Sequence, residues 1–255
     1  MPHSNETSAI KRGAFFGRRK GHALRPRQAS LLHELLPKLA LDLSAPAPAD
    51  PTTLFPQRAH YVRLEIGFGG GEHLAAQARA HPDLGFIGCE PFVNGMAKML
   101  AAIDADHISN IRLHFGDAIE LLDWLPDGVL AGVDILYPDP WPKRRHWKRR
   151  IVRDETIAAL ARVLRQGADV HFATDIADYA AWTLERFARA PTFHWAAECA
   201  ADWRKPWPGY LPTRYEAKAR RDGRVPSYLV FRRTDRPADA PADEKIKAPS
   251  KRGQV

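Results

Sequence analysis

Short apolar runs alternate with helix-like runs along most of the chain, and this alternation constrains the fold more than any other feature. The apolar runs have strand length, and the segments between them repeat apolar residues at helical spacing. This order favours an α/β fold with a doubly wound, Rossmann-like, mostly parallel sheet and helices on both faces. We also expect one antiparallel strand near the C-terminus. The expected strands lie within residues 61–66, 84–91, 110–118, 133–140, 168–175, 193–198 and 227–234, and the expected helices within residues 73–81, 93–104, 154–165 and 178–189.

The segments at both ends of the chain differ in composition from this region. Residues 1–28 are polar and basic, and we expect them to form a partly disordered N-terminal arm. Residues 234–255 are rich in proline, alanine and charge, and we expect a disordered tail there. Residues 29–233 then make up a single domain, in which the proline-rich residues 44–57 connect to the first strand.

Composition disfavours several classes of protein. No apolar run approaches the ~20 residues of a membrane span, and the N-terminus lacks the apolar stretch of a secretory signal. Cys89 and Cys199 are the two cysteines, and their separation suggests neither a disulfide framework nor a metal site. We therefore expect a cytoplasmic protein that binds no metal and no membrane.

Positive charge is concentrated in two segments. The net charge is +8, with seven Lys/Arg against one Glu in residues 1–28 and six Lys/Arg in residues 143–150. The rest of the chain is net acidic. This distribution fits a protein that binds a polyanion, and it fits equally a solvated surface with a flexible tail.

A glycine-rich loop follows the first expected strand in "EIGFGGGE", residues 65–72. Gly67 and Gly69 permit a positive φ and a close approach of the backbone to a ligand. A dinucleotide-binding loop would place its third glycine at position 72, where this chain has Glu72. Together with Glu65, Glu72 would repel a pyrophosphate and suits a cationic ligand such as S-adenosylmethionine. A tight turn without a ligand would use the same glycines.

Two more acids come at the ends of expected strands. Glu90 ends the second strand, where an acid can accept hydrogen bonds from both ribose hydroxyls. Asp117 ends the third strand, where an acid can accept a hydrogen bond from an adenine amine. Each of them taken alone is also a typical helix N-cap or loop residue. Because ligands of open α/β sheets bind at the carboxyl ends of the strands, we expect these acids to share one site.

The stretch "YPDPWPKRRHWKRR", residues 137–150, places a single acid, Asp139, at the start of a dense basic run. The two prolines beside Asp139 fix their own φ and restrict the residues before them, which limits the movement of this carboxylate. Trp141 and Trp147 offer flat surfaces on which an unstacked base can rest. The alternative is that they are core residues, and we favour it for Trp141 because it adjoins a strand end.

These segments, together with "GCEP", "GDA", "ATD" and "TRYEAKA", occur in the order and spacing of the bacterial tRNA (guanine-N7-)-methyltransferases. The chain resembles that family over roughly residues 14–232, and residues 137–150 are the most specific element. Tyr137 departs from the family, which often has Phe there, and Ala219 stands where Gly is usual.

The resemblance implies a class I methyltransferase fold, S-adenosylmethionine as cofactor without a metal, and guanine N7 in the tRNA variable loop as the target. It implies tRNA as the partner of a monomer or homodimer that needs no obligate protein partner. The donor-binding residues expected from the loop and the resemblance are Glu65, Gly67, Gly69, Glu90, Asp117 and Asp139. The expected RNA-binding residues are Lys143, Arg145, His146, Lys148, Arg149, Arg150, Asp175, Thr213, Arg214, Tyr215 and Glu216.

The target atom explains why the motifs hold no nucleophile or general base. Guanine N7 carries an in-plane lone pair and no proton, so the reaction needs alignment, which can supply about 7–11 kcal/mol of the barrier. We expect Asp139 to be the catalytic residue, which orients base and donor and favours the cationic product. We expect Asp175 to select guanine over adenine by accepting a hydrogen bond from N1–H or N2–H.

Other functions stay open on the sequence. A dehydrogenase that uses NAD(P) is disfavoured by Glu72, and an RNA-binding protein with an inactive methyltransferase fold is disfavoured by the retained acids. The same chemistry on another RNA or another guanine atom is a third alternative. Thr213 and Glu216 also match a capping box at the start of a helix, and we expect them both to cap that helix and to contact substrate. His146 is expected to donate to a phosphate.

Overall fold

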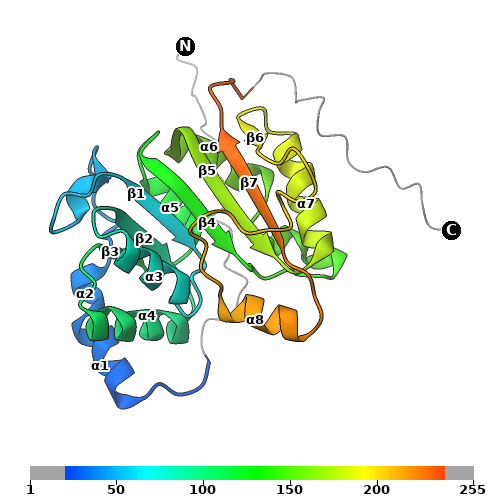
Figure 1. Cartoon of the computed structure of the whole chain (residues 1–255). Helices are drawn as coiled ribbons and strands as arrows, with labels where there is room; N and C mark the ends of the chain where they lie inside the picture. Colours follow the sequence, from blue (N-terminus) through cyan, green and yellow to red (C-terminus); the bar gives the residue numbers. More distant parts are fainter. Residues whose placement is uncertain (1–20, 239–255) are drawn as a thin grey trace, which may run out of the picture.

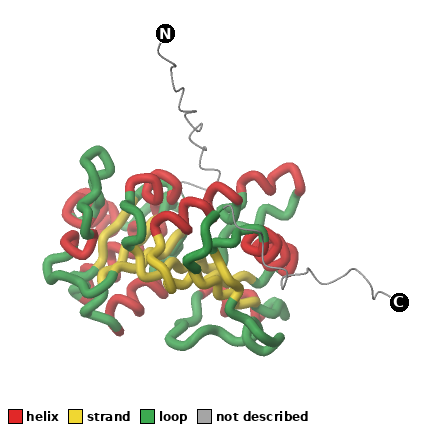
Figure 2. Tube along the Cα trace, turned by 90° about the horizontal axis from the view of Figure 1, so that it is seen from above, coloured by secondary structure: helices red, strands yellow, loops and turns green. Residues whose placement is uncertain are grey.

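A seven-stranded sheet runs through the part of the chain, residues 21–238, that the computed structural model describes (Figures 1 and 2). The strand order is β3-β2-β1-β4-β5-β7-β6. Strands β1 to β5 are parallel, whereas β7 is antiparallel to both of its neighbours. The expected α/β fold with one antiparallel strand near the C-terminus is thus confirmed. The strands are β1 (Val62–Ile66), β2 (Gly85–Cys89), β3 (Ile111–His114), β4 (Leu130–Leu136), β5 (Leu164–Thr174), β6 (Phe193–Trp195) and β7 (Ser227–Arg233).

Three helices cover one face of the sheet: α5 (Ala118–Trp124), α6 (Asp154–Val163) and α7 (Ala177–Ala188). Alternate strand residues point to opposite faces, and Leu64, Val133 and Val170 lie in register on this one. They are fully buried against apolar residues of the three helices. The larger of the two main cores therefore fills this side of the sheet.

The opposite face is covered in two different ways. Over β1, β2 and β3 it packs against α1 (Pro26–Glu34), α2 (Leu36–Leu39), α3 (Glu72–Ala80) and α4 (Val93–Asp106), which form a second core. Over β4, β5 and β7 it meets the loop of residues 196–213 instead of a helix, and Trp207 of this loop stacks on His171. The loop leads into α8 (Arg214–Arg221), which lies beyond the arrowheads of the central strands in Figure 1.

Helix boundaries follow local chemistry. Asp154 and Glu155 occupy the first turn of α6, where negative charge is favoured by the helix dipole. Helices α1 and α2 are separated at Leu35, and Pro37 lies in the first turn of α2, where its missing N–H costs no helical hydrogen bond. Among the described helices, none combines the length and the apolar character that a bilayer crossing requires.

The predicted N-terminal arm and C-terminal tail fall mostly outside the described residues. Residues 1–20 of the predicted arm and residues 239–255 of the predicted tail are not among the described residues. Residues 21–28 are described: the Gly21 amide donates to Asn94 Oδ1, and Pro26 begins α1, which packs against α4.

Candidate active site

The glycine loop after β1 forms one wall of a cavity of about 410 Å³ at the carboxyl edge of the sheet. Gly67 and Gly69 have φ values of 72° and 56°, which disfavour any residue with a Cβ. A Cβ built on Gly67 would meet no atom within 4 Å, so this glycine faces open space. The volume lies within the range of small-molecule sites. The lining includes Gly67, Gly69, Glu90, Asp117, Asp139 and Tyr215.

Glu90 ties the glycine loop to the end of β2. Its carboxylate accepts hydrogen bonds from the Gly69 amide at 2.7 Å and from the Phe92 amide at 2.9 Å. Burial raises the pKa of Glu90, and the negative charge of Asp139 adds to the rise. The carboxylate thus shapes the loop and lines the cavity.

Gly95, a residue the sequence analysis did not single out, supports the same loop from α4. A Cβ on Gly95 would come within 2.3 Å of the Gly69 carbonyl oxygen, so only glycine allows this packing. A glycine inside a predicted helix is destabilising unless close packing requires it. The position of Gly95 within the expected helix 93–104 was the signal in the sequence that could have identified it.

Asp117 lies between β3 and α5 and has two roles. Its carboxylate caps α5 by accepting a hydrogen bond from the Ile119 amide at 2.9 Å. It also lines the cavity. The N-cap and ligand-site interpretations of this acid are therefore compatible.

Asp139 lies at the mouth of the cavity on a strained loop. Tyr137 and Trp141, two residues before and after it, have φ values of 50° and 42°. Each left-handed non-glycine residue costs roughly 1–3 kcal/mol, which the surrounding structure must offset. The Asp139 side chain reaches solvent, yet the cavity walls remove part of its hydration and raise the pKa of its carboxyl.

The basic run folds into a short 3₁₀ helix, η2 (Arg144–Arg149), beside this loop. Lys143, Arg145 and Lys148 are exposed, and Lys148 and Arg149 line the cavity. Partial desolvation and then the neighbouring cations lower the pKa of His146, so at neutral pH it offers a neutral N–H donor. These side chains form a cationic rim next to Asp139.

Arg150 departs from the expectation that it binds RNA. Its guanidinium is fully buried, pairs with Asp178 and lies over the rings of Trp147, Tyr179 and Trp182. A phosphate cannot reach it without disruption of this packing. The structure therefore corrects the expected role of Arg150 from RNA contact to an internal one.

The two tryptophans of the basic run lie in different surroundings. Trp141 is half-buried, lines the cavity and lies under the guanidinium of Arg149. Trp147 packs edge-on against Trp182 of α7. The preference for Trp141 as a core residue was wrong, because its side chain is only half-buried and lines the cavity.

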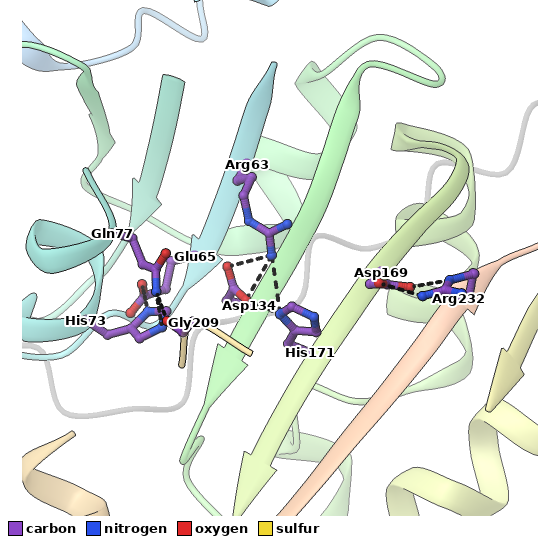
Figure 3. A network of polar contacts seen from close by, with 9 residues as sticks. All are labelled: Arg63, Glu65, His73, Gln77, Asp134, Asp169, His171, Gly209 and Arg232. Atoms are coloured by element: carbon purple, nitrogen blue, oxygen red, sulfur yellow. Dashed lines mark hydrogen bonds and ion pairs between the residues drawn. The ribbon is translucent and has the colours of Figure 1, made fainter. Parts of the chain in front are cut away.

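Glu65 does not line the cavity. Its carboxylate is buried and forms a hydrogen bond with Nδ1 of His73 in α3 at 2.8 Å (Figure 3). One helical turn after His73, the Gln77 side chain donates to the carbonyl oxygen of Gly209 in the 196–213 loop. Burial acts to lower the pKa of His73, but the hydrogen bond and charge of Glu65 outweigh it and raise that pKa. Glu65 thus has a partner within the protein, and its expected contact with the donor stays a prediction.

A second group of polar side chains lies beside Glu65, on adjacent strands of the sheet. Asp134, in register with Glu65, bonds Arg63 at 3.1 Å and His171 at 2.8 Å (Figure 3). The Arg63 guanidinium and the His171 hydrogen bond outweigh burial and hold the pKa of Asp134 well below its ordinary value. The face under the 196–213 loop is therefore polar, which explains why no apolar helix covers it.

The "TRYE" segment, residues 213–216, forms the N-cap and first turn of α8. Some of its side chains point into the protein and others toward the cavity. The Thr213 hydroxyl accepts a hydrogen bond from the Glu216 amide, as expected for a cap. The Glu216 carboxylate is buried and accepts hydrogen bonds from the hydroxyls of Tyr210 and Tyr228, and its expected contact with the substrate stays a prediction. Tyr215, 45% exposed, lines the cavity.

Arg214 and Asp175 lie near the cavity with partners inside the protein. Arg214 pairs with Glu72 at 3.7 Å, which joins the start of α8 to the start of α3. Asp175, after β5, accepts a hydrogen bond from Arg224 and is not part of the cavity lining. Its contact with a base therefore stays a prediction.

The sheet order, the glycine loop after β1 and the acids at the ends of successive strands together define a methyltransferase of the Rossmann-like class. Residues 59–227 match the family model described as "Putative methyltransferase". The chain is 60% identical over 228 residues to the tRNA (guanine-N(7)-)-methyltransferase of Nitrobacter hamburgensis. The match covers 89% of this chain and 89% of the relative. It is 60% identical to the tRNA (guanine-N(7)-)-methyltransferase of Bradyrhizobium diazoefficiens, over 87% of this chain and 94% of the relative. The chain therefore belongs to the tRNA (guanine-N(7)-)-methyltransferase family.

Proposed function

We propose that this protein transfers a methyl group from S-adenosylmethionine to N7 of a guanine in tRNA, and forms 7-methylguanosine in the variable loop. The observation that carries the proposal is the position of Asp139, between a glycine-walled acidic cavity and a cationic rim. The names of the relatives support the reaction. We place it in the cytoplasm, where tRNA is modified, as a monomer or homodimer.

The cavity fits the proposed donor by the chemistry of its lining. Glu90, Asp117 and Asp139 offer carboxylates to hydroxyl, amine and ammonium groups, and Gly67 leaves room beside them. Glu72 is the first residue of α3, directly after the glycine loop, and its negative charge at this helix N-terminus disfavours the pyrophosphate of a dinucleotide. When bound, the donor supplies an electrophilic methyl group attached to a sulfonium.

Asp139 acts on the reaction through its charge and its fixed position. The carboxylate orients the base and stabilises positive charge on the methylated purine, as preorganised groups do for charge that develops during a reaction. The ring atom that attacks has no proton to lose, so no side chain of the site needs to act as a base. The strained loop keeps Asp139 at the cavity mouth before the RNA arrives.

Exposed cations flank the cavity mouth on two sides. The basic run contributes Lys143, Arg145 and Lys148, and α8 contributes Lys218 and Arg221 from the same helix that brings Tyr215 to the cavity. Phosphate contacts dominate the affinity of proteins for nucleic acids and position the substrate. We therefore assign both sides to the tRNA backbone.

The double variant Lys143→Gln/Arg145→Gln is expected to weaken tRNA binding and to reduce its salt dependence. Each lost phosphate contact lowers the slope of log K against log salt by about 0.7–0.9. Fluorescence anisotropy between about 50 and 200 mM salt measures the slope. Arg79→Gln is the control, because Arg79, in the last turn of α3, pairs with Asp106 and does not line the cavity. An unchanged slope would remove the basic run from the RNA-binding surface.

Donor affinity is expected to fall as the pH falls through the raised pKa of Glu90. The carboxylate form accepts hydrogen bonds and the protonated form loses acceptor capacity, so binding releases a proton. The decline begins at a higher pH than for an ordinary glutamate of pKa about 4.3. Calorimetric titration of S-adenosylmethionine between about pH 5 and 8 measures this, and Glu90→Gln should remove most of the pH dependence. A flat profile in the wild type would contradict the assignment.

Transfer of a labelled methyl group to a tRNA transcript tests the proposed reaction. A matched transcript with 7-deazaguanine at the target position lacks the attacking nitrogen and should accept no label. Equal labelling of both transcripts would place the reaction at another atom. Binding of tRNA without transfer to either would favour the RNA-binding protein, and binding of NAD(P) in place of the methyl donor would favour the dehydrogenase.

A further inference from the structure

One arginine of the basic run, Arg150, is turned into the protein. Its side chain has no exposed surface, and its guanidinium lies 5.1 Å from the centre of the Trp147 ring and 4.8 Å from those of Tyr179 and Trp182. Nη2 donates to the carboxylate of Asp178 in the first turn of α7. The charge is thus balanced within the protein.

The other edge of the same guanidinium holds the loop that carries Asp139. Arg150 Nε donates to the carbonyl oxygen of Pro140 at 2.8 Å. This carbonyl directly follows Asp139 and precedes Trp141, one of the two residues with a positive φ. The loop is held at its other end by the Tyr137 amide, which donates to the Ala173 carbonyl of β5 at 2.8 Å.

We propose that Arg150 is a positioning residue for methyl transfer, which ties the 137–141 loop to α7 and so fixes the carboxylate of Asp139 at the cavity mouth. The proposal rests on the function assigned above. The planar fork of an arginine reaches two acceptors in fixed directions, here Pro140 and Asp178, and a lysine has one nitrogen for both.

Two simpler roles fit the contacts less well. A phosphate ligand must be accessible, and this guanidinium is not. A residue that only fills the core needs no charge, because a buried ion is costly and a nonpolar side chain of similar volume usually packs as well or better. The hydrogen bond to Pro140 accounts for the charge, since it lies next to the residue on which the reaction depends.

The test compares Arg150→Lys, Arg150→Met and Asp178→Asn with Arg186→Gln in the full chain. Arg186 is the matched control, since its guanidinium also lies over Trp182 but pairs with Asp154 instead of the loop. Under saturating donor and tRNA, the Arg150 variants should lose about 10²-fold in kcat, the scale expected when a reacting group is misplaced by about 1 Å. Their dissociation constants for donor and tRNA should stay within about threefold of wild type.

Hydrogen exchange gives a readout that does not depend on activity. Amides of the peptide spanning residues 137–150 should exchange faster in the Arg150 and Asp178 variants than in wild type and in Arg186→Gln. Asp178→Asn keeps the arginine in place and covers the case in which Arg150→Met fails to fold. It should show a smaller loss of kcat in the same direction.

The outcomes separate the possible roles. A kcat per folded molecule equal to that of Arg186→Gln would make Arg150 a purely structural residue and overturn the proposal. A loss of tRNA affinity with a shallower salt slope and normal kcat would restore the phosphate role and also overturn it. If the wild-type protein itself transfers no methyl group to tRNA, the proposed function fails first, and faster exchange in the variants would then establish the loop anchor alone.

Discussion

Asp139→Ala should lower turnover about 10²–10³-fold, the scale seen when one preorganised electrostatic group is removed from an active site. The carboxylate stands at the cavity mouth on a loop bounded by Tyr137 and Trp141, both with a positive φ, so its position is set before substrate binds. The affinity of the Asp139→Ala variant for tRNA should equal that of the wild type or be slightly higher, because a negative charge is removed beside the cationic rim. Single-turnover kinetics at saturating substrates and anisotropy with tRNA measure the two effects separately.

Asp139→Asn is the matched variant, with the same shape and no charge. If the charge matters, it should lose nearly as much turnover as the alanine variant; if orientation through hydrogen bonds matters more, it should keep a larger share. Equal losses of turnover and tRNA affinity in the alanine variant would contradict the assignment of Asp139 to the reaction.

Glu90→Ala should weaken donor binding about 10²-fold, because each hydrogen bond to a charged group contributes about 1.5–3 kcal/mol and every 1.4 kcal/mol is tenfold in affinity. The substitution frees the amides of Gly69 and Phe92, so the glycine loop loses its anchor and the cavity loses a carboxylate. Calorimetry with S-adenosylmethionine gives the affinity directly.

Glu120→Ala is the control for this prediction. Glu120 is an exposed acid in the first turn of α5 and does not line the cavity, so donor affinity should be unchanged. A Glu90→Ala protein that is less stable but binds the donor normally would show that Glu90 only braces the loop. Thermal unfolding measured beside the titration distinguishes the two results.

The strands and their mostly parallel direction could be predicted because they depend on short-range patterns. Alternation of strands and helices, and the right-handed connections of parallel strands, leave few topologies open. The position of the cavity followed from the same rule, since Glu90, Asp117 and Asp139 come at strand ends and parallel strands end at one edge. The short helix α5 was missed, because its seven residues are too few for a clear helical period.

Burial of individual charges could not be predicted, since it depends on partners that only the folded chain brings close. Arg150 is turned inward by Asp178 of α7, and Glu216 by Tyr228 of β7. Glu65 is satisfied by His73, eight positions on, and that pairing needs the glycine turn between them. A charged residue in a motif gives the type of chemistry, and only the fold decides which way it faces.

The place of β7 between β5 and β6 has a consequence for biosynthesis. Strand β6 pairs only with β7 among the described strands, and α8, which brings Tyr215 to the cavity, comes directly before β7. A chain still on the ribosome, with residues after about 200 unmade, holds the acids and the glycine loop but has an unfinished sheet and an open cavity wall. The wall that Tyr215 contributes is therefore among the last parts of the cavity to be synthesised, well after the acids and the glycine loop.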